Sequence, residues 1–170
     1  MKLKGSARRF KKDQENDINT DYIISGRYKF KIQDPKELAK HVMEDLDPDF
    51  YNRRQDGDFI VAGRNFGCGS SREQAPQSIK YANISAVIAK SFARIFYRNA
   101  FNIGLLLIEC DTDGIDEADK LSVDLDEGLI KNLTKKTEIK IMPLAKVMQT
   151  LLKDGGVIEH FRKNKGFKFN

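Results

Sequence analysis

Short apolar runs separated by polar turns divide the first two thirds of the chain into alternating strands and helices. Three runs have the apolar character of strands that are buried on both faces of a parallel sheet, and they span 58–62, 85–89 and 105–109. The segments between them predict a helix that ends near Ala82 and a second helix over 92–102. This alternation of strands and helices is typical of a parallel α/β core.

A further helix is predicted to begin at Asp34, an N-cap residue that is followed by Pro35 at the first helical position. Its apolar stripe consists of Leu38, Val42, Met43 and Leu46. The dipeptide Asp47-Pro48 is expected to end this helix, because a residue before proline disfavours helical geometry. The segment before Asp34 predicts a strand followed by loops.

The last third of the chain changes to a β-rich pattern and then to two helices. The elements expected there are strands at 121–125, 129–133 and 138–142 and helices at 144–152 and 157–163. Asp126-Glu127-Gly128 is typical of a hairpin turn. Since the chain has neither an internal repeat nor a linker, we expect one domain over residues 1–170. Its predicted fold class is α/β, with a parallel α/β core and an added β-rich layer.

The composition is that of a globular protein, with 40% hydrophobic and 32% charged residues. It excludes disordered and collagen-like chains. No apolar stretch approaches the ~18 residues of a membrane helix, and the basic start lacks the apolar region of a secretory signal. Two cysteines are too few for a disulfide framework. These features predict a cytoplasmic protein that does not enter the membrane.

The net charge of +5 is concentrated at the two ends of the chain. The segments 1–12 and 161–170 are basic and contain no acid, whereas acids outnumber bases between them. Nucleic-acid surfaces usually spread their bases over a folded face with aromatic side chains among them. We therefore treat these ends as flexible segments that serve solubility or the docking of a partner. A non-catalytic RNA-binding module that uses them is the alternative from another functional class.

The segment 63–74 carries the strongest chemical signal, with three glycines in seven residues ahead of Ser70-Ser71-Arg72. Ser71 and Gln74 have capping-box spacing, which predicts that both serines lie at a helix N-terminus. Unpaired amides and the positive helix dipole favour an anion there, and the Arg72 fork suits a carboxylate or phosphate. In such surroundings the Ser70 alkoxide is stabilised and can take a proton from carbon.

An ordinary glycine-rich turn with a capping serine would also explain this segment. Several named motifs are excluded, because no Gly-Lys-Ser/Thr ending of a P-loop and no third glycine in dinucleotide-binding register is present. The chain also lacks the Gly-x-Ser-x-Gly elbow of serine hydrolases.

The run Gly67-Cys68-Gly69-Ser70-Ser71-Arg72-Glu73, followed by Ala75-Pro76, resembles the signature of the aconitase swivel domain. It is most similar to the free-standing form of this domain in the small subunits of the 3-isopropylmalate dehydratase family. Further agreement over nearly the whole chain lies at 19–24, 26–28, 34–41 and 89–99. The resemblance implies a swivel-type fold and a hydro-lyase that interconverts 2-isopropylmalate and 3-isopropylmalate in leucine biosynthesis. Water would be removed and re-added through an alkene.

The resemblance also assigns roles to individual residues. It implies that Ser70 is the catalytic base that removes a proton beside a substrate carboxylate, and that Ser71 and Arg72 bind the carboxylate. Other substrate-binding residues that it implies are Thr20, Asp21 and Arg27. The loop expected to select the substrate side chain contains Tyr28, Lys29, Phe30 and Lys31.

In this family a [4Fe–4S] cluster lies on a separate large subunit. Cys68 and Cys110 have no ligand spacing, and such clusters are held by three or four thiolates. We therefore expect that this chain binds no metal or cofactor and is active only with a large subunit.

The substrate class is a small dicarboxylic or tricarboxylic hydroxy acid, and two readings of its side chain stay open. Phe30 favours an apolar pocket, whereas Lys29 and Lys31 would suit an additional carboxylate. The first pattern favours 3-isopropylmalate dehydratase. The alternative is a small subunit of homoaconitase or of a methylated-malate dehydratase.

Overall fold

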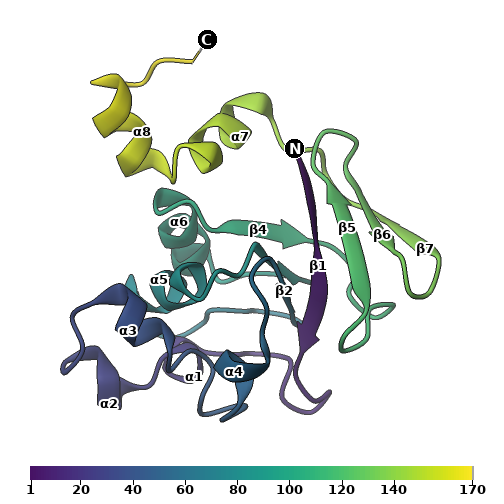
Figure 1. Ribbon diagram of the computed structural model, residues 1–170, viewed down its shortest axis with the longest axis horizontal. Helices are drawn as coiled ribbons and strands as arrows, with labels where there is room; N and C mark the ends of the chain where they lie inside the picture. Colours follow the sequence, from purple (N-terminus) through teal and green to yellow (C-terminus); the bar gives the residue numbers. More distant parts are fainter. Residues whose placement is uncertain (170) are drawn as a thin grey trace.

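Within residues 1–169, which the structure describes apart from the Lys29 side chain, the computed structural model contains one mixed sheet of seven strands (Figure 1). The strands are β1 (Lys2–Arg9), β2 (Phe59–Val61), β3 (Ala86–Ala89), β4 (Leu106–Glu109), β5 (Lys120–Asp124), β6 (Leu129–Asn132) and β7 (Thr137–Lys140). The helices are α1 (Thr20–Ile23), α2 (Gly26–Lys29), α3 (Pro35–Ala39), α4 (Phe50–Arg53), α5 (Gln74–Tyr81), α6 (Arg94–Asn102), α7 (Lys146–Lys153) and α8 (Val157–Asn164).

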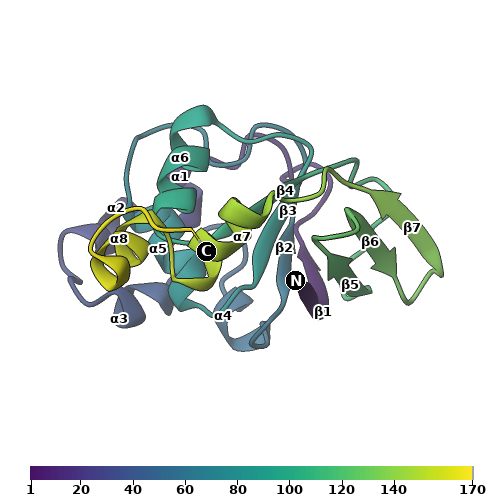
Figure 2. The same cartoon turned by 90° about the horizontal axis from the view of Figure 1, so that it is seen from above.

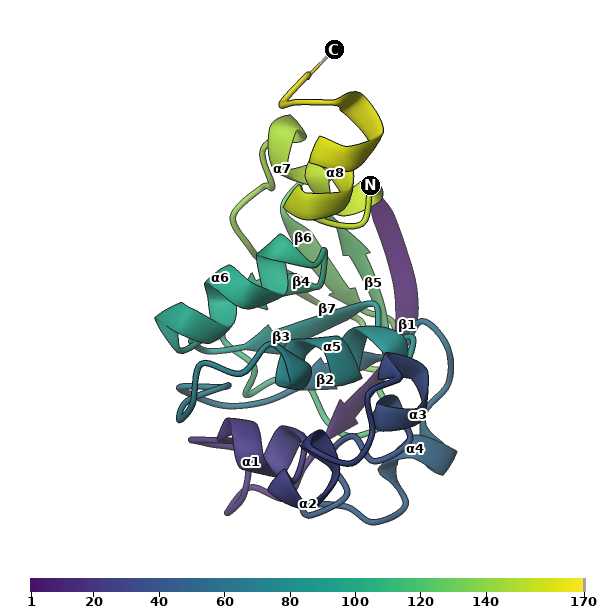
Figure 3. The ribbon, with the colours of Figure 1, turned by 90° about the vertical axis from the view of Figure 1, so that its left-hand side faces the viewer.

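The sheet has a parallel half and an antiparallel half that meet at β1. Its strand order is β4-β3-β2-β1-β5-β6-β7, with parallel pairing from β4 to β1 and antiparallel pairing from β1 to β7. Helices α5 and α6, which connect the parallel strands, lie in front of β2, β3 and β4 in Figure 3. This confirms the predicted parallel α/β core.

Alternate side chains of the parallel strands enter two different cores, because successive residues of a strand face opposite sides of the sheet. Ile60 and Val87 belong to the core under the helices, whereas Phe59 and Ile88 belong to the core shared with β5 and β6. Figure 2 shows the helices on one side of β1–β4 and the antiparallel strands on the other. The predicted β-rich layer is therefore present, and it is continuous with the core sheet through β1.

The basic segment at the start of the chain is an inner strand of the sheet and not a flexible end. In β1, Ala7 lies opposite Phe59 of β2, and Leu3 lies opposite Val123 of β5. The basic side chains pair with acids from other parts of the chain, as in the Arg8–Asp58 ion pair at 2.6 Å. The basic end segment at 161–170 likewise begins inside α8. Contacts made only in the folded protein therefore hold basic side chains whose own segments contain no acid.

Several helix boundaries predicted in the first third of the chain differ from those in the structure. Helix α3 begins after the Asp34 N-cap as predicted but ends at Ala39. It cannot continue to 46, because Met43 adopts a left-handed φ of 58° and its amide donates to Ile23 O. The four-residue helices α1, α2 and α4 were not predicted. None of the described helices combines the length and apolar content that a bilayer span requires.

Candidate active site

The glycine-rich loop follows β2, at the carboxyl end of the parallel strands, where α/β proteins bind their ligands. Isolated parallel bridges tie it to two other segments, Asn19 to Cys68 and Phe66 to Phe92. At Gly67 the backbone has a φ of 79°, and a Cβ there would lie 2.2 Å from Phe96 Cγ. Only glycine fits this position, because any side chain would collide with the α6 aromatic ring.

Ser70 lies beside Thr20, as the predicted site requires. The two hydroxyl oxygens are 3.1 Å apart, and the Ser70 amide also donates to Thr20 Oγ1 at 3.1 Å. Because Thr20 Oγ1 accepts that amide, its own proton can be donated to Ser70 Oγ. A donor aimed at the serine oxygen stabilises the alkoxide form. Thr20 is 1% exposed, so the structure places it behind Ser70 and not on the open surface.

Arg72 forms an ion pair with Asp21 at the same edge of the protein. The Asp21 side chain is 61% exposed and that of Arg72 is 26% exposed, so an incoming carboxylate can reach the pair. In the described part of the chain, the backbone amides of Ser71, Arg72 and Glu73 have no acceptor. These donors and the guanidinium together make a surface suited to a carboxylate.

The helix that follows the motif begins later than the capping-box pattern predicted. The first residue of α5 is Gln74 and its N-cap is Glu73, which makes no side-chain capping bond. Ser71 does not cap the helix. Its carbonyl accepts a hydrogen bond from Asn99 Nδ2 of α6 at 3.0 Å. The non-local contacts of Ser71 and Arg72 therefore override the local capping signal, and Ser70 and Ser71 lie outside regular secondary structure before the helix.

Arg27 is not joined to this cluster by any hydrogen bond or ion pair among the described residues. Its guanidinium pairs with Asp45, and its Nε donates to Ser25 Oγ at 3.2 Å. We expected Arg27 to bind substrate together with Ser70. Arg27 pairs with Asp45 here, but its side chain is 62% exposed, and its role in substrate binding stays a prediction.

The loop expected to select the substrate side chain divides into an inward and an outward part. The Tyr28 ring stacks on His41 with centroids 3.8 Å apart, and its hydroxyl donates to Glu44 Oε1 at 2.8 Å. This hydrogen bond is the main reason that the Tyr28 pKa is raised. Phe30 is 83% exposed and Lys31 is also exposed, whereas the Lys29 side chain lies outside the described residues. Tyr28 thus has a structural contact, and the exposed residues are Phe30 and Lys31.

The thiols of this chain are poor candidates for metal ligands. Burial raises the pKa of Cys68, and burial raises the pKa of Cys110 to about 11, so both prefer the protonated form. Cys68 Sγ donates to Asp17 O at 3.4 Å. Among the described residues, no group of three His, Cys, Asp or Glu side chains could hold a metal ion. An iron–sulfur cluster does not fit this donor set.

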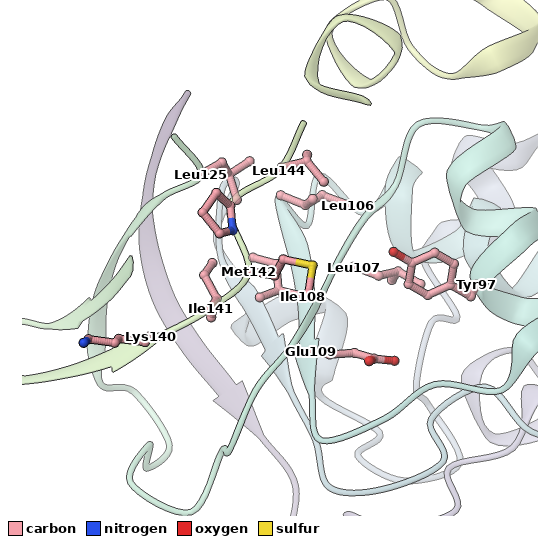
Figure 4. A pocket seen from close by; sticks show the side chains of 11 residues that line it. Tyr97, Leu106, Leu107, Ile108, Glu109, Leu125, Lys140, Ile141, Met142 and Leu144 are labelled. Carbon is pink, nitrogen blue, oxygen red and sulfur yellow. The ribbon is translucent and has the colours of Figure 1, made fainter. Parts of the chain in front are cut away.

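A groove of about 460 Å³ lies on another part of the surface, along the free edge of β4 (Figure 4). It is lined by Tyr97 of α6, residues 106–109, Leu125 and residues 140–144. Figure 4 shows that apolar side chains dominate it, with Glu109 and Lys140 toward its ends. The motif residues do not line this groove, and Ser70 and Ser71 lie instead on an exposed surface.

The contact between Thr20 and Ser70 makes a prediction for the assembled enzyme. Replacing Thr20 with valine keeps the side-chain shape but removes both hydrogen bonds, so we expect kcat to fall roughly tenfold to a hundredfold. Thr20→Ser keeps the hydroxyl and is the matched control, with activity close to wild type. Steady-state rates of the two variants give the comparison. Equal rates for valine and serine would show that the hydroxyl is not needed.

Comparison with known proteins gives consistent matches over most of the chain. The family model of the aconitase C-terminal domain matches residues 5–113. The chain is 53% identical to 3-isopropylmalate dehydratase small subunit 2 of Archaeoglobus fulgidus, covering 99% of both chains. It is 55% identical to the 3-isopropylmalate dehydratase small subunit of Caldicellulosiruptor saccharolyticus, over 94% of this chain and 90% of that one.

A solved structure agrees with these relatives. The crystal structure of 3-isopropylmalate dehydratase from Methanocaldococcus jannaschii superposes with a TM-score of 0.89. The two sequences are 47% identical, and the match covers 97% of this chain and 96% of that one. Sequence and fold therefore point to the same group of proteins.

Proposed function

Because this chain belongs to the aconitase C-terminal domain family, and within it to the small subunits of 3-isopropylmalate dehydratase, we propose that it supplies the proton-transfer half of that hydro-lyase. The reaction moves a hydroxyl group between adjacent carbons, interconverting 2-isopropylmalate and 3-isopropylmalate. The observation that carries this proposal is the pairing of Ser70 with Thr20 next to Arg72 on an exposed surface.

Ser70 acts as the general base in this proposal. A serine hydroxyl is a weak base in water, so the site must stabilise its alkoxide. A proton donated by Thr20, the free amides after Ser70 and the Arg72 guanidinium would all favour negative charge at this place. The same oxygen returns the proton to carbon when water adds back to the alkene.

Arg72 positions the substrate by binding a carboxylate, with Ser71 beside it. Its planar fork can make two parallel hydrogen bonds to a carboxylate, which fixes the orientation of the acid as well as its place. Asp21 holds the guanidinium before substrate arrives. A bound carboxylate would share or replace that partner. The guanidinium is therefore already oriented before each turnover.

The site is incomplete on this chain alone. Ser70 and Ser71 are exposed, whereas proton abstraction from carbon needs a site from which water is excluded. The small-subunit identity implies a heteromeric complex, and we propose that a large subunit covers this surface. We also propose that the [4Fe–4S] cluster, which assists departure of the hydroxyl in this family, belongs to that subunit. Its ligands cannot come from Cys68 and Cys110.

We propose a cytoplasmic enzyme with a dicarboxylic substrate that carries an apolar side chain. The exposed Phe30 and the names of the relatives favour isopropylmalate over a tricarboxylic acid such as homoaconitate or over a methylated malate. RNA binding has little support, because Lys2 and Arg9 at the basic start are paired with Asp124 and Glu15 within the fold.

Reconstitution with the large subunit tests the proposed function. We expect the purified chain to show neither iron–sulfur absorbance nor turnover, and the mixture with a cluster-loaded large subunit to convert 2-isopropylmalate to 3-isopropylmalate. The same mixture is then assayed with homoaconitate and with methylated malate. A preference for the tricarboxylate of at least about tenfold, near 1.4 kcal/mol, would overturn the substrate assignment. Turnover by the chain alone would overturn the shared site.

A further inference from the structure

The segment that carries the base has no regular secondary structure, so its geometry depends on side chains from elsewhere. Residues 70–72 lie between the glycine-rich loop and α5, and α5 does not cap itself with Ser70 or Ser71. Thr20 holds the Ser70 amide and hydroxyl from the α1 side. A second, independent contact holds the next residue, because Asn99 Nδ2 donates to Ser71 O at 3.0 Å from the α6 side.

Helix α6 contacts both ends of this stretch with one face. Phe96 and Asn99 are three positions apart, which places them on the same side of a helix. Phe96 fills the space where a Gly67 side chain would lie, and Asn99 reaches the Ser71 carbonyl. The Phe96 ring is itself held edge-on by Phe66 at a centroid distance of 5.4 Å. The loop is therefore fixed to a rigid element at Gly67 and again at Ser71.

The Asn99 contact also sets the direction of the neighbouring amide. In a trans peptide the carbonyl of Ser71 and the amide of Arg72 point in opposite directions. With the carbonyl turned toward α6, the Arg72 amide faces away from that helix, and it has no acceptor among the described residues. Without the Asn99 bond this peptide could rotate, which would turn the free Arg72 amide and release the chain between Ser70 and Arg72 from α6.

We propose that Asn99 is a positioning residue for the base, because its side-chain amide fixes the Ser71–Arg72 peptide and so holds Ser70 and Arg72 in register with one substrate. The inference rests on the proposed function, since it concerns the same reaction. Asn99 acts through the backbone of Ser71. A misplacement of about 1 Å at a reacting group can lower a rate by about a hundredfold, so a single hydrogen bond in this place matters to catalysis.

Two variants of Asn99 in the reconstituted complex test this role. Asn99→Ala removes the donor, and we expect kcat to fall about tenfold with a smaller change in KM. Asn99→Asp keeps the shape but places a carboxylate against the Ser71 carbonyl, so its loss at neutral pH is at least as large. When the pH is lowered, the carboxyl takes up a proton and can donate again. The rate of Asn99→Asp relative to wild type is therefore expected to recover, whereas that of Asn99→Ala stays low.

The matched control is Asn102→Asp, one turn further along α6, where the side chain makes no hydrogen bond to a described residue. Its rate is expected to follow wild type at every pH, and the amount of assembled complex is measured for all variants. If Asn99 serves stability alone, its variants will lower the amount of complex, and Asn99→Asp will show the same relative loss of rate at every pH. That result would overturn the proposal. A wild-type kcat in both Asn99 variants would also overturn it. Wild-type turnover is the reference, so failure of the proposed function appears separately, as an inactive wild-type complex.

Discussion

Replacing Ser70 with alanine is expected to lower kcat of the reconstituted complex by about a thousandfold, within the range usually lost with a general base. The alanine cannot accept the proton, and the oxygen that contacts Thr20 is gone. Folding should be unaffected, because Ser70 is exposed and its removal creates no cavity. KM should change little, since Arg72 still binds the substrate carboxylate.

The neighbouring serine provides the control for this experiment. Ser71→Ala keeps the Ser71 backbone and its bond to Asn99 but removes a hydroxyl assigned to substrate binding. We expect it to raise KM with a smaller effect on kcat, the opposite division from Ser70→Ala. Exchange of the substrate carbon-bound proton with deuterated solvent gives a second readout, and it should disappear only in Ser70→Ala. A Ser70→Ala complex with nearly wild-type kcat would remove Ser70 from the role of base.

Replacing Asp58 with asparagine is expected to lower the free energy of unfolding by about 3 kcal/mol at neutral pH. It removes the nearer carboxylate from Arg8, a largely buried cation, which then keeps only the 3.6 Å contact with Glu117. Asp58 is 2% exposed and accepts hydrogen bonds from the Ser6 amide at 3.0 Å and the Gln55 amide at 2.8 Å. Its other contact is with Arg8 Nε at 2.6 Å. Asparagine offers only one acceptor oxygen to these three donors, so at least one donor loses its partner.

The stability that Asp58 contributes is expected to decrease at low pH. Burial tends to raise the pKa of Asp58, but the amides of Gln55 and Ser6 and the Arg8 guanidinium outweigh it and lower the pKa. A carboxyl with a lowered folded pKa stabilises the protein above its unfolded value of about 3.9, and this stabilisation is lost as the pH falls through the folded pKa. The difference in unfolding free energy between wild type and Asp58→Asn should therefore shrink in acid.

Urea unfolding at a series of pH values measures that difference. The matched control is Asp56→Asn, two residues earlier, where an exposed carboxylate pairs with Arg54 at 2.8 Å. Because the Asp56 side chain is 70% exposed, water can replace it beside Arg54, and the pair contributes less than about 1 kcal/mol, so the control should remain close to wild type. If Asp58→Asn unfolds at the same urea concentration as Asp56→Asn, the contact between β1 and the turn before β2 does not stabilise the sheet.

The elements that could be predicted from sequence are those whose pattern is local. The strands β2, β3 and β4 appear as short apolar runs, and the glycines and polar residues that flank them mark their ends. The hairpin between β5 and β6 is equally local. Helix α3 shows the limit of this reasoning, since its apolar stripe continues beyond Ala39 but the chain does not remain helical. What ends it is the Met43 amide bound to Ile23 O, a contact that no local pattern contains.

The candidate site shows the same division between local and distant information. Glycine spacing drew attention to 63–74, and the family resemblance added Thr20 and Asp21, which the structure places beside Ser70 and Arg72. The resemblance also suggested Arg27, which pairs with Asp45 in this structure and whose role in substrate binding stays a prediction. Asn99 was missed as a site residue. Its only sequence signal was its place three residues after Phe96 within a stretch that agrees with the family, and that spacing has meaning only once α6 is known to pack on the loop.

The place of β1 in the sheet has a consequence for how the chain acquires its structure. Both neighbours of this strand are distant in sequence, since Ala7 pairs with Phe59 and Lys2 pairs with Asp124. During translation β1 therefore leaves the ribosome before both of its partners, and its second edge is covered only after residues 120–124 have been made. Contacts of such long range slow folding, and an uncovered edge can associate with other chains in the meantime. Synthesis of this small subunit is thus expected to be more sensitive to chaperone supply than its size alone would indicate.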